Sequence, residues 1–341
     1  MDARPTSAAP APLIGVDLQK SYMQRGSWGH RTIRKVVDGV TLAAREGQTV
    51  GVVGESGSGK STLGRLLLAL TPPDAGEVRF HDRPFPLREP ADYREFRQSV
   101  QMVFQNPLLS FNPRLTIGSS LVDAMRLRDD LTHRKTKFAE AASLLGQVGL
   151  DANLLERYPA ETSGGQLQRV GIARALAAKP RIIFLDEPTS SIDVSNRGQI
   201  LNLLKTLQGE HGLGYVLISH DFKVIAALAS YVLVMYLGQV MEEGPLQAVL
   251  QRPLHPYTQA LIEASRPRPA ARPVWKLRGE AKVPPPGFAG CKLIGRCPFA
   301  VPECERPQEV SVSSDGHAVR CWRAHDLKTG MDPQSNAQAN H

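Results

Sequence analysis

The sequence predicts an α/β protein in which apolar strands alternate with helices, and three observations support that prediction. An apolar, β-branched run at residues 50–53 leads into a glycine-rich loop and then into a helical apolar pattern. Two further apolar runs, at 181–187 and 215–219, lead to polar side chains and are separated by a helical stretch. Residues 117–157 carry helical patterning without a strand signal, as an inserted helical subdomain would.

The glycine-rich loop has the spacing of a phosphate-binding loop (P-loop), Gly54-x-x-x-x-Gly59-Lys60-Ser61, between the predicted strand and helix. Glycines allow backbone angles that a Cβ would forbid. Successive amide groups can therefore wrap a phosphate at the positive end of the helix. Lys60 would reach the β- and γ-phosphates, and the Ser61 hydroxyl would bind Mg²⁺. The predicted nucleoside triphosphate site comprises Gly54, Glu55, Ser56, Gly57, Ser58, Gly59, Lys60, Ser61 and Thr62.

Composition is that of a soluble globular protein long enough for two domains, at 341 residues. The longest apolar run, residues 224–237, is too short to span a bilayer and is expected to be a helix end followed by a core strand. The net charge of +8 is not gathered into blocks of like charge, which predicts a solvated basic surface. Residues 1–12 lack the apolar core of a signal peptide and are expected to be a disordered lead-in of a cytoplasmic protein.

The remaining elements follow in order along the chain. Strands are expected at 13–22, 36–42, 77–80, 100–105, 181–187, 215–219, 231–236 and 239–243. Helices are expected at 63–70, 94–98, within 117–157, at 167–178 and at 194–209. Residues 266–286, rich in proline and arginine, predict a linker or an extended segment that wraps along the protein.

Polar groups stand at the ends of these strands and at the start of one helix. They are Gln105, the segment Ser163-Gly164-Gly165-Gln166, the pair Asp186-Glu187, and His220. Open α/β sheets bind their ligands at the carboxyl ends of strands. Each group alone could be structural, for example as a helix cap or a buried histidine. Their order and spacing after a P-loop favour one shared site.

With these motifs the chain resembles the ATP-binding subunits of ATP-binding-cassette (ABC) transporters over residues 13–262. The resemblance implies a RecA-like P-loop core with an antiparallel β subdomain and an inserted helical subdomain. The predicted organisation is an ATPase domain at 13–265, with the helical subdomain at about 107–172, a C-terminal extension at 266–328 with a small four-cysteine module, and a disordered tail at 329–341.

The resemblance also implies roles in ATP hydrolysis. Glu187 would be the general base that polarises the attacking water, and His220 would contact the γ-phosphate. Gln105 would sense Mg²⁺ and the water, and would couple them to the loop that follows. Asp186 would bind Mg²⁺ together with Ser61 and Gln105.

In this family two ATP molecules are sandwiched head to tail between two subunits, so half of each site would come from the partner. The residues with this role in trans would be Ser163, Gly164, Gly165, Gln166 and Asp193. The adenine would stack on Tyr22, and Trp28 is the less favoured candidate. Thr162 stands where the family most often has an apolar residue. That position packs rather than contacts phosphate, so ATPase activity is expected to persist.

Residues 106–114, 255–261 and the cysteine-bearing end resemble the oligopeptide/dipeptide importers within the family. The implied function is the ATPase (translocase) subunit of an importer for peptides or related solutes. It would be peripheral, on the cytoplasmic face of the cell membrane. The implied partners are a second, related ATPase subunit, two transmembrane permeases, and a periplasmic or extracellular solute-binding protein, with no nucleic acid.

Four cysteines lie between residues 291 and 321 and none elsewhere: Cys291, Cys297, Cys304 and Cys321. In a cytoplasmic chain this clustering favours metal or cluster ligation over disulfides. The paired C-x₂-C spacing of structural zinc is absent, and some members of the resembled branch carry a [4Fe–4S] cluster at these positions. The leading prediction is a [4Fe–4S] cluster, with zinc and metal-free thiols as alternatives.

A rival function is a soluble ABC ATPase acting on nucleic acid in repair or translation, which the net charge and the cysteines favour. Against it, the chain has one cassette, no long coiled-coil insertion, and no interleaving of aromatic and basic residues. A regulatory ATPase without transport is a further alternative, although every catalytic position is filled.

Overall fold

The computed structural model describes residues 12–25, 31–128, 130, 133–190, 192–265, 276–285 and 287–324. The predicted lead-in apart from Pro12, the predicted tail and most of the predicted linker lie outside these residues, as does Trp28. The described residues from 276 to 324 are called the C-terminal segment below. No helix within the described ranges has both the length and the apolar character that crossing a membrane requires.

One sheet is antiparallel and has the order β2-β1-β4-β5. Its strands are β1 (Leu13–Arg25), β2 (Arg31–Ala44), β4 (Ala75–Phe80) and β5 (Arg83–Pro84). The β1–β2 hairpin extends past the predicted strand ends, because pairing continues from Leu13 with Ala44 to Arg25 with Arg31. This sheet carries Tyr22 near the end of the hairpin at which Arg25 pairs with Arg31.

The other sheet has the order β11-β12-β10-β9-β3-β8-β7-β6. Its strands are β3 (Thr49–Val53), β6 (Val100–Val103), β7 (Ile182–Asp186), β8 (Gly214–Ser219), β9 (Tyr231–Tyr236), β10 (Gln239–Pro245), β11 (Ser311–Val312) and β12 (Ala318–Val319). The strands from β6 to β9 in this order run parallel, whereas β10, β12 and β11 are added antiparallel. Parallel pairing brings the carboxyl ends of the central strands to one edge.

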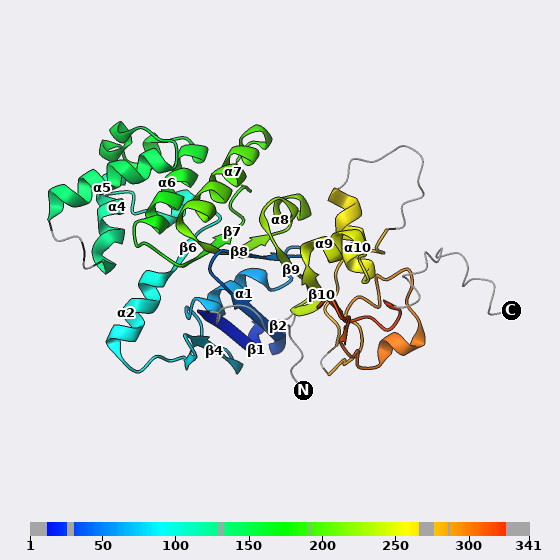
Figure 1. Cartoon of the computed structure of the whole chain (residues 1–341). Coiled ribbons are helices and arrows are strands. Elements are labelled where there is room, and N and C mark those ends of the chain that lie inside the picture. Colours follow the sequence, from blue (N-terminus) through cyan, green and yellow to red (C-terminus); the bar gives the residue numbers. More distant parts are fainter. Residues whose placement is uncertain are drawn as a thin grey trace.

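Helices cover both faces of this sheet. The α-helices of the described residues are α1 (Lys60–Leu67), α2 (Pro90–Ser99), α3 (Pro107–Ser110), α4 (Ile117–Ala124), α5 (Arg134–Gln147), α6 (Gly164–Leu176), α7 (Val194–His211), α8 (Phe222–Leu228), α9 (Leu246–Gln251) and α10 (Pro256–Ser265). Short 3₁₀ turns are η2 (Met125–Leu127), η3 (Ala152–Glu156), η4 (Pro159–Glu161) and η5 (Pro302–Glu305). Figure 1 shows α4, α5 and α6 gathered at one end of the molecule and the C-terminal segment at the other.

The central strands are buried on both faces, which is why they are apolar at nearly every position. Along β7, Ile182 and Phe184 point into one apolar cluster with α1 and the antiparallel sheet. Ile183 and Leu185 point into the other cluster, which the helical end shares. This alternation fixes the register of the strand, because a slip of one residue would exchange the two faces. The residues at the ends of these strands are therefore held in fixed positions by the register of the sheet.

The strand leading to Gln105 is shorter than predicted. Pairing with β7 ends at Val103, opposite Leu185. Phe104 and Gln105 are exposed, and Asn106 already caps α3 by accepting a hydrogen bond from the Leu109 amide. A local cap signal overrides the apolar run here.

The C-terminal segment does not form a core of its own. Residues of β12 pair with β10, Val319 opposite Glu242 and Ala318 opposite Glu243. Cys291, Leu293 and Cys304 belong to the main apolar cluster. The segment therefore packs on the ATPase sheet and extends it.

Candidate active site

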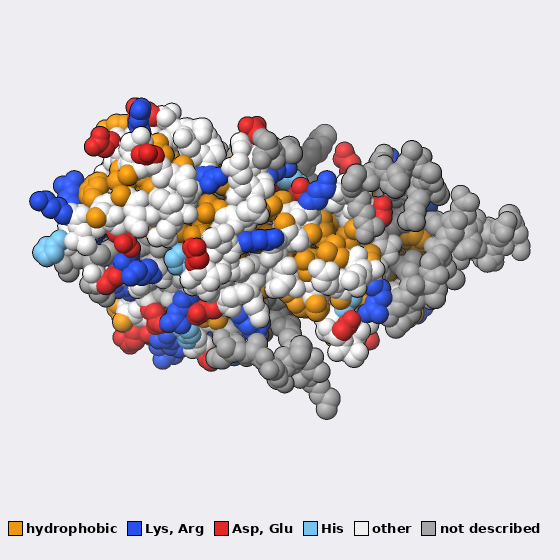
Figure 2. Space-filling view, turned by 45° about the horizontal axis from the view of Figure 1, so that its top comes forward, with side chains coloured by type: hydrophobic (Ala, Val, Ile, Leu, Met, Phe, Trp, Pro, Cys, Tyr) orange, Lys and Arg blue, Asp and Glu red, His pale blue; other side chains and the backbone are white. Residues whose placement is uncertain are grey.

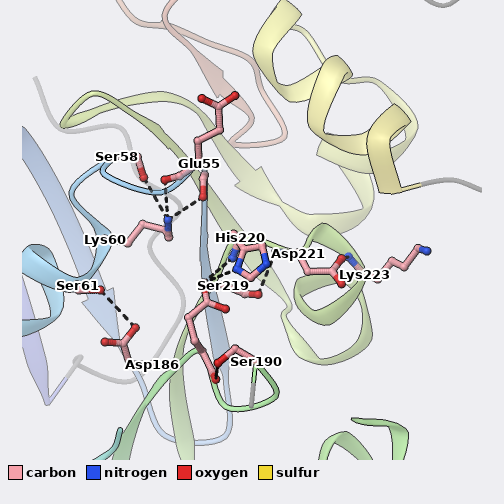
Figure 3. A network of polar contacts seen from close by, with 12 residues as sticks. Glu55, Ser58, Lys60, Ser61, Asp186, Ser190, Ser219, His220, Asp221 and Lys223 are labelled. Atoms are coloured by element: carbon pink, nitrogen blue, oxygen red, sulfur yellow. Dashed lines mark hydrogen bonds and ion pairs between the residues drawn. The ribbon is translucent and has the colours of Figure 1, made fainter. Parts of the chain in front are cut away.

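Residues from β3, β7 and β8 meet at the carboxyl edge of the parallel sheet (Figure 3). Lys60 and Ser61 begin α1 directly after the P-loop, and Asp186 ends β7. Glu187 follows β7, and His220 follows β8. Residues more than 120 positions apart in the sequence thus lie within hydrogen-bond distance, as in the contact between Ser61 and Asp186.

The glycines of the P-loop are required by its path. Gly59 has φ 102°, and a Cβ there would collide with the carbonyl oxygen of Val36. A Cβ on Gly54 would collide with the carbonyl oxygen of Met235. The loop therefore lies against two neighbouring strands, β2 and β9, at distances that only glycine allows.

Lys60 is buried, and its ammonium group bonds within its own loop. Nζ donates to the carbonyl oxygens of Gly54 at 2.7 Å and Glu55 at 2.9 Å, and to the Ser58 hydroxyl at 3.3 Å. Burial lowers the pKa of Lys60, and the carboxylates of Glu187, Asp186 and Glu55 oppose that shift. An anionic phosphate would compensate the buried charge more directly than carbonyl oxygens do.

Two hard oxygen donors converge beside this lysine. The Ser61 hydroxyl lies 3.4 Å from Oδ1 of Asp186. Burial, with Glu187 as the second cause, raises the pKa of Asp186. A divalent cation would relieve this pair of neighbouring carboxylates. The donor set fits Mg²⁺.

The backbone of Glu187 is strained, and hydrogen bonds orient its carboxylate. Its φ is 49°, in the left-handed region that a glutamate rarely adopts. Its amide donates to the Ile218 carbonyl oxygen at 2.9 Å, and its Oε1 accepts from the His220 amide at 2.9 Å. Nδ1 of His220 lies 2.8 Å from the same oxygen. The Glu187 side chain is 12% exposed and that of His220 is 62% exposed, so the histidine covers the carboxylate from the solvent side.

Tyr22 and Gln105 are exposed and stand outside this hydrogen-bonded cluster. Tyr22 is 40% exposed and pairs across the hairpin with Arg34. Arg34 in turn donates to the Gly57 carbonyl oxygen of the P-loop at 3.4 Å. This contact joins the hairpin that carries Tyr22 to the P-loop. Gln105 is exposed, and within the described residues it has no hydrogen bond to the cluster.

The segment Ser163-Gly164-Gly165-Gln166 opens α6. Ser163 and Gln166 form a reciprocal capping box, in which the Gln166 amide donates to the Ser163 hydroxyl at 3.3 Å and the Ser163 amide donates to Oε1 of Gln166 at 3.1 Å. In the part of the chain that the structure describes, no hydrogen bond joins this segment to the P-loop of the same chain. The segment is largely exposed, so it is free to meet another molecule.

Thr162 and Asp193 flank these exposed elements. The Thr162 hydroxyl donates to the Pro159 carbonyl oxygen at 2.8 Å, so this side chain is engaged locally rather than aimed at a ligand. Asp193 is exposed at the start of α7, where its carbonyl oxygen accepts from the amide of Asn196 at 2.9 Å.

Comparison with known proteins identifies the family. Residues 37–190 match the family model described as ABC transporter, and residues 241–304 match the one described as oligopeptide/dipeptide transporter, C-terminal region. The oligopeptide transport ATP-binding protein OppF of Escherichia coli (strain K12) is 42% identical over 304 residues, 88% of this chain and 91% of the relative. The chain belongs to the ATP-binding subunits of oligopeptide and dipeptide ABC transporters. Like the rest of this family, it is an ATPase that powers transport.

Other relatives agree. The dipeptide transport ATP-binding protein DppF of E. coli K12 is 40% identical, covering 91% of this chain and 94% of the relative. Among solved structures, a dimeric post-hydrolysis state of the ATP-binding cassette MJ0796 bound to ADP and Pi matches with a TM-score of 0.61 and 29% identity, over 69% of this chain and 98% of that chain. The ABC ATPase fold predicted from the motifs is thereby confirmed.

The rival function on nucleic acid finds no support. The relatives named above are transport ATP-binding proteins, and this chain matches them over nearly their whole length. On the face shown in Figure 2, Lys and Arg side chains are interspersed with Asp and Glu rather than gathered into one basic stripe. Such a surface lacks the concentrated positive charge that phosphate backbones require.

The predicted [4Fe–4S] cluster is wrong for the described residues, and the zinc alternative fares no better. Cys291, Cys297, Cys304 and Cys321 all line one small cavity, together with apolar side chains such as Leu293 and Phe299. Even so, no group of three or more Cys, His, Asp or Glu side chains in the described ranges is arranged to hold a metal ion. Burial raises the pKa of Cys291 to about 11 and the pKa values of Cys297 and Cys321 to about 12.

Sequence reasoning missed three residues that contact the P-loop from outside it. They are Arg34 of β2, Tyr257 of α10 and Arg296 of the C-terminal segment. Tyr257 stands in the His-Pro-Tyr-Thr stretch that resembles the peptide importers, and that resemblance was its only signal. For Arg296, the sequence gives no signal beyond its position between two cysteines.

Proposed function

We propose that this chain hydrolyses ATP at a site shared with a second ATPase subunit and so drives the import of oligopeptides, dipeptides or related small solutes. The observation that carries the proposal is the meeting of Lys60, Ser61, Asp186, Glu187 and His220 at one sheet edge. The transported class follows from the names of the relatives, which include oligopeptide and dipeptide transport proteins.

In this proposal Glu187 is the general base. Its carboxylate is aimed by two hydrogen bonds from His220, one from the backbone amide and one at the ring. As the base takes the proton of the attacking water, His220 would steady the carboxylate and reach the γ-phosphate. Lys60, with the amides of residues 54–62, would hold the β- and γ-phosphates. Tyr22 would stack on the adenine.

Mg²⁺ would be held by the Ser61 hydroxyl and Asp186, with Gln105 completing the set. When bound, the ion neutralises charge on the phosphate oxygens. Gln105 stands between β6 and α3, so a change at its side chain would be passed to the exposed loop at 106–113. We propose that loop as the contact with a permease.

The second half of the site would come from the partner ATPase. The amides of Ser163, Gly164, Gly165 and Gln166 lie in the exposed first turn of α6, whose positive end favours a phosphate. Asp193 would lie along the same interface. The dimeric solved relative supports such an arrangement.

We infer that the partner ATPase is a related, different chain, and that two permeases and a solute-binding protein complete the transporter. The chain would then sit peripherally on the cytoplasmic face of the membrane. We further propose an organisation into an ATPase domain at 13–265, with a helical subdomain at about 107–172, and a cysteine-bearing C-terminal module within 266–328.

The decisive experiment compares Glu187→Gln with wild type in the transporter purified with its membrane partners. ATP binding should be retained, while turnover should fall by about 10²- to 10⁴-fold, because the base is lost and the shape is kept. Glu210→Gln, an exposed glutamate near the end of α7, is the matched control and should turn over normally. Turnover of Glu187→Gln within a few-fold of wild type would remove Glu187 as the base. Co-purification with ribosomes or DNA in place of permeases would overturn the transport function.

A further inference from the structure

The P-loop contains an acidic side chain that points out of the nucleotide site. Glu55 directly follows Gly54, and its carboxylate extends away from Lys60 in Figure 3. Its backbone serves the loop: the carbonyl oxygen of Glu55 accepts from Lys60 Nζ at 2.9 Å and from the Ser58 amide at 3.2 Å. An uncompensated carboxylate here would attract Lys60 and repel the phosphates of a nucleotide.

Arg296 of the C-terminal segment compensates this carboxylate. Its guanidinium makes a bidentate contact with Glu55, Nη1 to Oε2 at 2.8 Å and Nη2 to Oε1 at 3.1 Å. The Arg296 side chain is 13% exposed and that of Glu55 is 35% exposed, so the pair is only partly screened by solvent. Bidentate arginine–carboxylate pairs fix orientation as well as charge.

Two tyrosines complete the clamp. The Tyr257 hydroxyl accepts a hydrogen bond from the Glu55 amide at 2.7 Å. The rings of Tyr236 and Tyr257 lie 4.8 Å apart, and Arg296 packs over the Tyr236 ring at 5.7 Å while also donating to its hydroxyl at 3.3 Å. The amide, the carbonyl oxygen and the carboxylate of Glu55 are therefore all engaged.

A second contact runs in parallel. Lys292 Nζ donates to the Leu237 carbonyl oxygen at 2.9 Å and pairs with Asp38 at 2.9 Å. Gly238, which follows Leu237, donates a hydrogen bond from its amide to the Ser58 carbonyl oxygen of the P-loop at 2.9 Å. The C-terminal segment thus contacts the P-loop directly at Glu55, and it is linked to Ser58 through the Leu237–Gly238 peptide.

We propose that Arg296, with Tyr257, is a positioning residue of the nucleotide site: it holds Glu55, so that the C-terminal segment sets the affinity of the P-loop for ATP. The proposal rests on the proposed function, because it assumes that the P-loop binds the nucleotide. The segment then tunes nucleotide affinity without contacting the nucleotide.

The test measures ATP affinity and steady-state hydrolysis with the full chain in its complex. Arg296→Met keeps the apolar stem and should raise Kd and KM for ATP about tenfold, with kcat at saturating ATP nearly unchanged. Arg296→Lys should recover part of the affinity by restoring the charge. Arg320→Met, another partly buried arginine of the segment, which donates to the carbonyl oxygens of Val240 and Gln308, should change Kd less than twofold.

A double-mutant cycle with Glu55→Gln identifies the route. Once the carboxylate is gone, adding Arg296→Met should change Kd less than twofold. Should Arg296→Met fail to fold, Tyr257→Phe removes only the acceptor of the Glu55 amide and should weaken ATP binding several-fold. Wild-type affinity in Arg296→Met, or the same loss with and without Glu55, would overturn the proposal. Lys60→Ala tests the premise that the two proposals share, because unchanged ATP binding there would refute the P-loop as the nucleotide site and both proposals with it. Weakened binding in Lys60→Ala together with wild-type affinity in Arg296→Met would refute only the role given to Arg296.

Discussion

Replacing His317 with leucine should loosen the attachment of the C-terminal segment to the ATPase sheet. His317 lies just before β12, and its Nε2 is 2.7 Å from Oε1 of Glu242 in β10. Both side chains are 0% exposed. Glu242 also accepts from the amides of Leu254 and His255, each at 2.8 Å. The substitution leaves a buried carboxylate with its two backbone donors but without its side-chain partner.

The expected cost follows from that geometry. Leaving a buried polar group without its hydrogen-bond partner costs about 1–3 kcal/mol, and more when the group is a carboxylate. Because Glu242 loses its side-chain partner but keeps two backbone hydrogen bonds, we expect a cost of about 3 kcal/mol. At 1.4 kcal/mol per factor of ten, protection of the β12 amides against hydrogen exchange should fall by about a hundredfold.

The assay is native-state hydrogen exchange with detection at single elements, supported by limited proteolysis of the C-terminal segment. Amides of β7, in the centre of the sheet, serve as the internal reference and should keep their protection. His211→Leu, at the exposed end of α7, is the matched control and should stay within about 0.5 kcal/mol of wild type. Unchanged protection of β12 in His317→Leu would refute the role given to the Glu242–His317 pair.

Two further predictions concern the ATPase domain. Gly59 has φ 102° and lies against a backbone carbonyl of β2, so Gly59→Ala should destabilise the loop by about 1–3 kcal/mol and weaken ATP binding at least tenfold. In the control Gly146→Ala, in α5, the added Cβ meets no neighbouring atom, and this variant should bind ATP normally. Equal ATP binding by the two variants in a titration would contradict the prediction. Hydrogen bonds from Lys20 and the Ser21 amide lower the pKa of Asp74, so the stability they contribute is complete above about pH 4 and is lost as the pH falls through the lower, folded-state value. Urea denaturation of Asp74→Asn should therefore differ from wild type at neutral pH and converge with it in acid, and a constant difference across this range would count against the assignment.

Much of the nucleotide site is predictable from sequence because its elements are local. The order strand, glycine loop, helix is written in residues 49–67, and the burial of β3 on both faces explains its apolar run. Asp186, Glu187 and His220 could be predicted to lie together because each ends or directly follows a strand, and parallel strands bring their carboxyl ends to one edge. The boundary at Gln105 failed because a helix cap at Asn106 ends the pairing early.

The sequence by itself determined the ATPase core and its family, and it predicted which side chains gather at the site, since these depend on spacings within short stretches. Only the tertiary structure decided what the C-terminal segment does. Its strands extend the ATPase sheet, Cys291 and Cys304 join the main apolar cluster, and Arg296 reaches Glu55 across 241 positions of sequence. Contacts at such separations depend on how two surfaces fit, and that fit leaves no periodic or local pattern in the chain.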